Sequence, residues 1–256
     1  MKIINKEQLL RFLRFRNICR KFKIAYPLKR YFKPIIPLNI YQTWHTKELP
    51  PLMLKNSQKI KENNPAFNYQ LFDDVDCYNF IKENFDEPVA NAYNSLIPGA
   101  YKADLWRYCI LYINGGIYLD IKYGSMNNFK FINMTESEHF VLDADNNGIY
   151  NALLVCLPKN PKLLKAINSI VENVKHKYYG NHCLEITGPL LLKNFFTQSE
   201  KNKIDMVHSY YTFDNRFILF NNYFILKNYQ GDINETTQFK KVDHYSVLWN
   251  KRQVYI

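Results

Sequence analysis

The sequence predicts an α/β fold in which a mostly parallel β-sheet is flanked by helices. From about residue 38 onward, short apolar strand-like segments alternate with amphipathic helical segments, and turn-forming residues separate them. The composition is 47% apolar and 22% charged over 256 residues, with only 8 glycines, which is typical of a compact chain with a buried core. We therefore expect one globular domain over residues 35–256, preceded by an extension over residues 1–34.

The expected elements of this domain follow one another with recognisable start and stop signals. Prolines suit the first turn of a helix, aspartates suit the position before it, and glycines suit the position after its last turn. In chain order we predict a strand over residues 38–43, a helix from Pro50-Pro51 to about 63, a strand over 68–72, a helix after Asp73-Asp74, a helix over about 100–113 that stops at Gly115-Gly116, strands over 116–121 and 139–144, a helix over 161–176, and two strands in the last third.

The N-terminal extension carries most of the charge. Residues 1–33 contain eleven Lys or Arg against the single acid Glu7, so this segment holds +10 of the formal net charge of +11. From Glu7 to about Lys23, Leu, Ile and Phe recur near helical spacing among arginines and lysines, which predicts a basic amphipathic helix. Such a helix packs on the core or lies on an anionic membrane surface, and the sequence leaves both alternatives open.

The rest of the chain is almost neutral, which argues against nucleic acid as a partner. No run of eighteen uncharged apolar residues predicts a transmembrane helix, and the first thirty residues lack the pattern of a signal peptide. The 5 cysteines are widely spaced without a C-x-x-C pair, which is typical of reduced thiols. We expect a cytoplasmic protein, with peripheral membrane contact through residues 1–30 as one of the two alternatives for the N-terminal helix; the lumen of the Golgi or the endoplasmic reticulum is the alternative location.

Several catalytic motifs are absent. The sequence contains no P-loop, no G-x-G-x-x-G after a strand, no G-x-S-x-G and no H-E-x-x-H. Its 6 histidines form no tight metal-binding spacing. Nucleotide hydrolysis by a P-loop, dinucleotide-dependent chemistry, serine hydrolysis and zinc proteolysis therefore have no support.

The segment over residues 100–123 is the most informative. Asp104 and Arg107 are three residues apart on the predicted helix and so share one face. Asp120 ends the strand that follows, which places its carboxylate at the edge of the sheet where α/β proteins bind ligands. Spacing alone leaves a surface salt bridge and a turn aspartate as the alternative, at even weight.

The string ADLWRYCILYINGGIYLD, from Ala103 to Asp120, resembles the signature of glycosyltransferase family 32, the DXD-type nucleotide-sugar transferases, which includes fungal α-mannosyltransferases and inositol-phosphoceramide mannosyltransferases. Further matches to the family pattern occur in the same order along the chain. They are Ile40 to Trp44, Asn151, Asn160-Pro161, Thr187-Gly188-Pro189, and His244 with Trp249.

The resemblance implies a GT-A type, Rossmann-like fold and a retaining transferase that moves a hexose from a UDP- or GDP-sugar to a glycan, lipid or protein. It implies Asp104, Arg107 and Asp120 as catalytic residues. The implied donor-binding residues are Gln42, Thr43, Trp44, Asp104, Arg107, Tyr118, Asp120, Lys122 and Trp249. The implied acceptor-cleft residues are Asn151, Thr187, Gly188 and Pro189.

The sequence departs from the D-x-D pattern, because Lys122 stands where the second carboxylate is expected. A protonated lysine repels a metal ion instead of binding it. Three alternatives remain open. Asp120 and His244 hold Mn²⁺ or Mg²⁺, with Asp143 or Asp145 as a further ligand; the Lys122 ammonium neutralises the diphosphate itself; or the protein binds a nucleotide sugar or a carbohydrate without catalysis.

Overall fold

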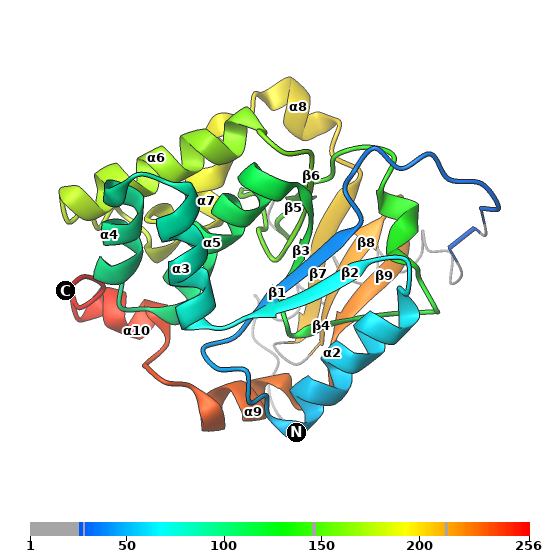
Figure 1. Ribbon diagram of the computed structural model, residues 1–256, viewed down its shortest axis with the longest axis horizontal. Coiled ribbons are helices and arrows are strands. Elements are labelled where there is room, and N and C mark those ends of the chain that lie inside the picture. The colour runs from blue at the N-terminus through cyan, green and yellow to red at the C-terminus, as the bar shows by residue number, and fades with distance from the viewer. Residues whose placement is uncertain (1–25, 28, 145–146, 213–214) are drawn as a thin grey trace, which may run out of the picture.

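The protein is described from a computed structural model over residues 26–27, 29–144, 147–212 and 215–256. A layer of helices lies against one β-sheet, and a second sheet lies on the other side of that sheet (Figure 1). Within these ranges, no helix combines the length and the apolar character that crossing a bilayer requires. The expected basic helix before Lys23 lies outside the described residues, so the proposed division at residue 34 stays a prediction.

The helices and strands follow the predicted order and add several elements to it. In sequence order they are β1 (Asn39–Thr43), α2 (Pro51–Asn63), β2 (Asn68–Phe72), α3 (Asp74–Asn84), α4 (Glu87–Ser95), α5 (Gly99–Asn114), β3 (Gly116–Leu119), β4 (Tyr123–Ser125), β5 (Val141–Leu142), β6 (Leu153–Cys156), α6 (Pro161–Lys175), α7 (Pro189–Leu192), α8 (Gln198–Asn202), β7 (Met206–Thr212), β8 (Asn215–Phe220), β9 (Tyr223–Asn228), α9 (Asp232–Phe239) and α10 (Tyr245–Asn250).

The first sheet has the strand order β2-β1-β3-β6. Strand β1 pairs in parallel with both β2 and β3, whereas β6 runs antiparallel to β3. Parallel pairing brings the carboxyl ends of β1 and β3 to the same edge of the sheet, where ligands bind in open α/β folds. The predicted α/β class with a parallel sheet flanked by helices is confirmed.

Side chains alternate across this sheet and divide the core in two. Tyr41 and Tyr118 belong to the core that packs against α3, α4, α5 and α6. Ile40 and Ile117, their neighbours along the strands, belong to the core shared with the second sheet. Both faces of this sheet are therefore buried, as is typical of parallel sheets.

The second sheet has the order β4-β9-β8-β7-β5 and is largely antiparallel. The sequence analysis anticipated three of its strands, β5, β7 and β8, but not β4 or β9, which pair with each other. The predicted strand over residues 139–144 is shorter than expected, because only Val141–Leu142 pairs with β7. Figure 1 shows this sheet beside the first one, with α2 and α9 near its lower end.

The turn between α5 and β3 is built on glycine. Gly115 ends the helix with φ +61°, and its backbone N–H donates to the carbonyl of Leu111. A Cβ atom added to Gly115 would lie 2.7 Å from the Cδ atom of Pro158. Conformation and space both require glycine here, and the turn fixes the position of Asp120 relative to α5.

Candidate functional site

The candidate site lies where β1 and β3 end, next to the first half of α5. Gln42 of β1 is fully buried and joins the two strands at this edge, because its Nε2 donates to the carbonyl of Leu119 over 3.3 Å. Tyr69 of β2 donates its hydroxyl to Gln42 Oε1 over 2.8 Å. Gln42, an implied donor contact, therefore acts in this structure as a buried link between three strands.

Arg107 lies between the two carboxylates. Its NH2 atom lies 3.3 Å from Asp104 Oδ1 and 3.3 Å from Asp120 Oδ1. Its NH1 atom donates to the carbonyl of Asn151 over 2.6 Å, and its guanidinium lies 4.3 Å from the centre of the Tyr118 ring. One buried cation thus holds α5 and the end of β3 together. Its contact with Asp104 is the one that the shared helix face predicted.

Asp104 is held from its other side by two buried polar side chains. Asn151 Nδ2 donates to its Oδ1 over 2.8 Å, and the Thr187 hydroxyl donates to its Oδ2 over 2.7 Å. Burial raises the pKa of Asp104, although Arg107 and Thr187 oppose the shift. Asn151 and Thr187 were expected in an acceptor cleft. Instead they are buried and position Asp104, because Asp104 requires hydrogen-bond partners when removed from water.

The other two expected acceptor-cleft residues lie beside this carboxylate. Pro189 begins α7 and is buried, and its carbonyl accepts from the backbone N–H of Ile149. A Cβ atom at Gly188 would lie 3.4 Å from Asp104 Oδ2, so the absence of a side chain leaves room for the carboxylate. The Thr187-Gly188-Pro189 turn packs against Asp104.

Asp120 has cations on both sides. The Tyr118 hydroxyl donates to its Oδ1 over 2.8 Å, and the Lys122 ammonium donates to its Oδ2. Burial works to raise the pKa of Asp120, but Lys122 and Arg107 outweigh it and hold that pKa below its usual value. Asp104 and Asp120 therefore differ in their readiness to take up a proton, although both contact Arg107.

Lys122 lies over two tyrosine rings. Its ammonium is 5.5 Å from the centre of the Tyr123 ring and 5.9 Å from that of Tyr150. Burial works to lower the pKa of Lys122, but Asp120 and Tyr150 outweigh it and raise that pKa. Arg216 is close enough to oppose this effect. Lys122 stays protonated at neutral pH and is the more accessible cation of the site, with its side chain 23% exposed against 5% for Arg107.

The sequence analysis did not identify three side chains that pack near Lys122, namely Tyr123, Tyr150 and His208. The His208 ring of β7 stacks on Tyr150 with centroids 3.8 Å apart, and the Tyr150 and Tyr123 hydroxyls are 2.8 Å apart. Asp143 lies 2.9 Å from His208 Nδ1. Burial, together with Lys122 and Arg216, lowers the pKa of His208 despite Asp143. In the sequence, the position of Tyr150 next to the motif residue Asn151 is the feature that could have indicated a role for this aromatic cluster.

In the ranges that the structure describes, the side chains that contact the Asp120 carboxylate are two cations and one hydroxyl donor, and the two cations disfavour a divalent metal ion at this carboxylate. Both oxygens of Asp120 accept from or pair with Tyr118, Arg107 or Lys122, and Asp143 is engaged by His208. Among the residues that the structure describes, no group of three or more His, Cys, Asp or Glu side chains could hold a metal ion. Asp145, a further expected ligand, lies outside the described residues.

His244, the other expected metal ligand, caps helix α10. Its Nδ1 accepts from the backbone N–H of Ser246 over 3.3 Å and lies 2.8 Å from the Ser246 hydroxyl. Burial lowers the pKa of His244, and Arg216, Lys240 and Lys122 lower it further. The lowered pKa favours neutral imidazole, the form that binds metal ions, but the positive charges of Arg216, Lys240 and Lys122 disfavour a metal ion at this position.

The remaining donor-contact expectations concern Thr43, Trp44 and Trp249. The Thr43 hydroxyl donates to the carbonyl of Phe72 over 2.9 Å, and the Trp249 indole donates to the carbonyl of Tyr179 over 2.7 Å. The Trp44 indole N–H is buried, and it has no hydrogen-bond partner within the described part of the chain. Of the three, Trp44 is the one whose polar group has no partner among the described residues.

The two carboxylates predict an ordered loss of function and fold in acid. The pKa of Asp104 is raised, so Asp104 protonates first as the pH falls towards its usual value of about 3.9. The pKa of Asp120 is lowered, so its contribution to stability is present above its unfolded pKa and is lost only as the pH falls through its lower folded pKa.

Donor titration and fluorescence-monitored unfolding between pH 7 and 3 should show that the affinity for the donor falls before the fold is lost. The Asp104→Asn variant should flatten the acid limb of the affinity profile, and a profile identical to wild type would contradict the assignment.

Comparisons with known proteins agree with this geometry. Residues 50–142 match the family model described as a glycosyltransferase sugar-binding region containing the DXD motif. The chain is 30% identical over 175 residues to the Saccharomyces cerevisiae mannosyl phosphorylinositol ceramide synthase SUR1, which covers 66% of this chain and 44% of that protein. It is 25% identical over 224 residues to inositol phosphoceramide mannosyltransferase 2 of Schizosaccharomyces pombe, which covers 87% of this chain and 63% of that protein.

A solved structure shares the fold. The PaToxG glycosyltransferase aligns with a TM-score of 0.50 and 18% identity over 76% of this chain and 77% of that one. The predicted GT-A type fold and the predicted resemblance to DXD-type glycosyltransferases are thereby confirmed. The chain spans less than two thirds of the length of the two fungal relatives, so their activities remain proposals for it.

Proposed function

We propose that this protein is a retaining glycosyltransferase that moves a hexose from a UDP- or GDP-sugar to a glycan, lipid or protein acceptor. The observation that carries the proposal is the cluster of Asp104, Arg107, Asp120 and Lys122 at the carboxyl edge of the parallel sheet. Mannose is the first sugar to test, because the names of both fungal relatives refer to mannosyl transfer.

The donor would lie across this edge. The resemblance assigns base stacking to Trp44, and this residue lies directly after β1 at this edge of the sheet. Asp104 retains acceptor capacity for a sugar hydroxyl, since a carboxylate offers about four lone-pair sites. Asn151 and Thr187 keep its orientation fixed.

We further propose that Lys122 provides the counter-charge for the diphosphate. The leaving nucleoside diphosphate gains negative charge as its bond to the anomeric carbon breaks, and a fixed cation aimed at that charge lowers the barrier. Lys122 is protonated, partly exposed and held by Asp120 and two tyrosine rings. Of the alternatives for the D-I-K sequence, the contacts of Asp120 favour the ammonium over a metal ion.

Retention of configuration requires a defined balance of bonds. The anomeric carbon loses its bond to the diphosphate oxygen and gains one to the acceptor oxygen on the same face. In the same-face route, the acceptor proton passes to the departing diphosphate. A covalent route needs an enzyme nucleophile, and the proposal assigns that role to no residue.

Donor hydrolysis in the absence of acceptor tests the enzymatic function directly. Wild-type protein should release free sugar from one nucleotide sugar, whereas Asp120→Asn should lower that rate by about 10²-fold or more, because Lys122 loses its anchor. The melting temperature of the variant should fall by only a few degrees. Selective donor binding with no released sugar from wild type would instead support a non-catalytic nucleotide-sugar-binding protein.

A further inference from the structure

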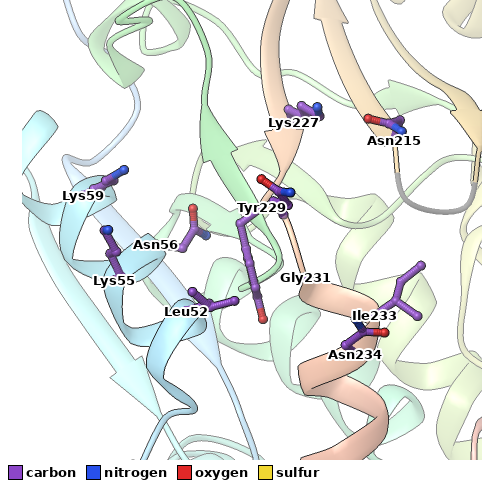
Figure 2. Close-up of a pocket in the computed structure, with 11 residues that line it drawn as sticks. Leu52, Lys55, Asn56, Lys59, Asn215, Lys227, Tyr229, Gly231, Ile233 and Asn234 are labelled. Carbon is purple, nitrogen blue, oxygen red and sulfur yellow. The ribbon is translucent and has the colours of Figure 1, made fainter.

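A cavity lies beside the turn that carries Asp120 and Lys122. Its volume is about 990 Å³, and it opens between α2, the sheet end of β9 and the start of α9 (Figure 2). Figure 2 shows Lys55 and Lys59 on α2 at one side of the cavity and Lys227 on β9 at another. The remaining lining residues are Leu52, Asn56, Asn215, Tyr229, Gln230, Gly231, Ile233 and Asn234.

The three lysines give the cavity an uncompensated positive charge. No acidic residue is among the described residues that line it. Within the described ranges, none of Lys55, Lys59 and Lys227 forms a salt bridge, whereas lysines elsewhere on the surface pair with nearby carboxylates. Three lysines that line one cavity from two sides, none of them in a salt bridge with a described residue, give it a positive potential that attracts an anion.

The wall of the cavity is rigidly joined to the candidate donor site. Asn56 is buried, and its Nδ2 donates to the carbonyls of Ile121 and Tyr123 over 3.0 Å and 2.9 Å. From the other side, the backbone N–H of Tyr229 donates to the carbonyl of Lys122 over 2.9 Å. Both flanks of the cavity therefore contact the backbone of the turn whose side chains form the donor cluster.

The carboxylate of Glu235 holds the N-terminus of α2 in place. The buried side chain of Glu235 accepts from the backbone N–H groups of Leu52 and Met53 over 2.8 Å and 2.9 Å, and from the Tyr229 hydroxyl over 3.0 Å. Glu235 contacts the N-terminus of α2 and forms no salt bridge with any of the three lysines. The lysine-bearing helix is held in place against α9 before any ligand binds.

We propose that the Lys55–Lys59–Lys227 cavity binds the phosphate group of a phosphorylated ligand. A phosphate group offers more acceptor oxygens to separate ammonium groups than a carboxylate does, and lysine binds phosphate as a point charge. The identification of this ligand as the acceptor rests on the proposed transferase function. The cavity is joined to the donor cluster through the contacts of Asn56 and Tyr229 with the backbone of residues 121–123, so a phosphorylated acceptor held here would be bound by the same rigid part of the fold.

The test removes the charges and keeps the side-chain length. The triple variant Lys55→Gln/Lys59→Gln/Lys227→Gln is compared with wild type and with Lys82→Gln/Lys165→Gln/Lys203→Gln, which lowers the net charge equally on surfaces away from the cavity. Calorimetric titration with glycerol 3-phosphate, with glycerol as the neutral control, measures a soluble source. Co-sedimentation with phosphatidylcholine vesicles, with and without phosphatidylinositol, measures a lipid headgroup. Ionic strength is held constant because exposed charges are screened by salt.

The cavity variant should bind one of these phosphate sources at least tenfold more weakly than wild type, and the control variant within about twofold. Selective weakening with either glycerol 3-phosphate or the vesicles supports the phosphate-binding site, and it identifies whether the ligand is a soluble phosphate or a lipid headgroup. Equal weakening in both variants, or no weakening in the cavity variant, overturns the proposal. Donor hydrolysis should be unchanged in both variants. Absence of hydrolysis in wild type would count against the proposed function alone, because the binding measurements require no turnover.

Discussion

Replacement of Lys122 by methionine should lower the rate of donor hydrolysis by about 10²–10³-fold, the range observed when one preorganised donor to a developing negative charge is removed. Methionine fills a similar volume but supplies no charge to the departing diphosphate. Asp120 keeps its contacts with Tyr118 and Arg107 in this variant, so the fold should persist. Single-turnover hydrolysis of the nucleotide sugar, measured beside thermal unfolding, checks both expectations.

The conservative variant Lys122→Arg is the matched control. It preserves the positive charge and the ion pair with Asp120, and it should retain more activity than Lys122→Met. If methionine supports hydrolysis within about threefold of the wild-type rate, Lys122 does not act on the leaving group. The cation for the diphosphate must then come from another residue or from a bound ion.

Replacement of Arg107 by alanine should cost about 3–5 kcal/mol in the free energy of unfolding, the usual penalty for breaking a buried ion pair by removing one partner. The loss leaves Asp104 buried without its cation and removes the link to Asp120. It also leaves the carbonyl of Asn151 without its donor. Urea unfolding at pH 7 measures the change.

A second variant separates buried charge from lost packing. Asn at position 104 is neutral, so Asp104→Asn combined with Arg107→Ala should recover part of the stability that Arg107→Ala alone loses. A cost below about 1 kcal/mol for Arg107→Ala would mean that water reaches the guanidinium and that the cluster is not buried as described. The absence of recovery in the double variant would indicate that packing against Tyr118 accounts for the loss.

The sequence predicted the half of the site that local geometry determines. Three-residue spacing placed Asp104 and Arg107 on one helix face, and the Gly-Gly turn followed by an apolar strand placed Asp120 at the sheet edge. Both features depend on helix and strand periodicity over about twenty residues, which a single chain displays directly. The contacts of Arg107 with both carboxylates agree with that interpretation.

The other half depends on contacts between distant segments. His208 stacks on Tyr150, and Lys122 lies over Tyr123 and Tyr150, because the second sheet brings β7 beside the turn after β3. No periodicity in the sequence encodes that pairing. Antiparallel strands late in the chain have many partners of equal local preference, and tertiary packing selects among them.

The expected acceptor cleft illustrates a different limit. Asn151 and Thr187 were identified as motif residues, but a motif does not distinguish a side chain that contacts a substrate from one that orients its neighbour. Their burial and their hydrogen bonds to Asp104 indicate the second role. Trp249 likewise packs in the core and donates to Tyr179, although its spacing from His244 fits the motif.

The central claim is that Lys122, and not a divalent metal ion, balances the charge of the donor diphosphate. The most direct measurement is the thermal shift produced by UDP- and GDP-mannose, each with Mn²⁺ and with EDTA, for wild type and for Lys122→Asp. Mass action stabilises whatever the native state binds, so a shift reports donor binding. In wild type, one nucleotide sugar should raise the melting temperature equally with Mn²⁺ and with EDTA. In Lys122→Asp, which restores the second carboxylate, the shift should require Mn²⁺. A wild-type shift that EDTA abolishes would contradict the account.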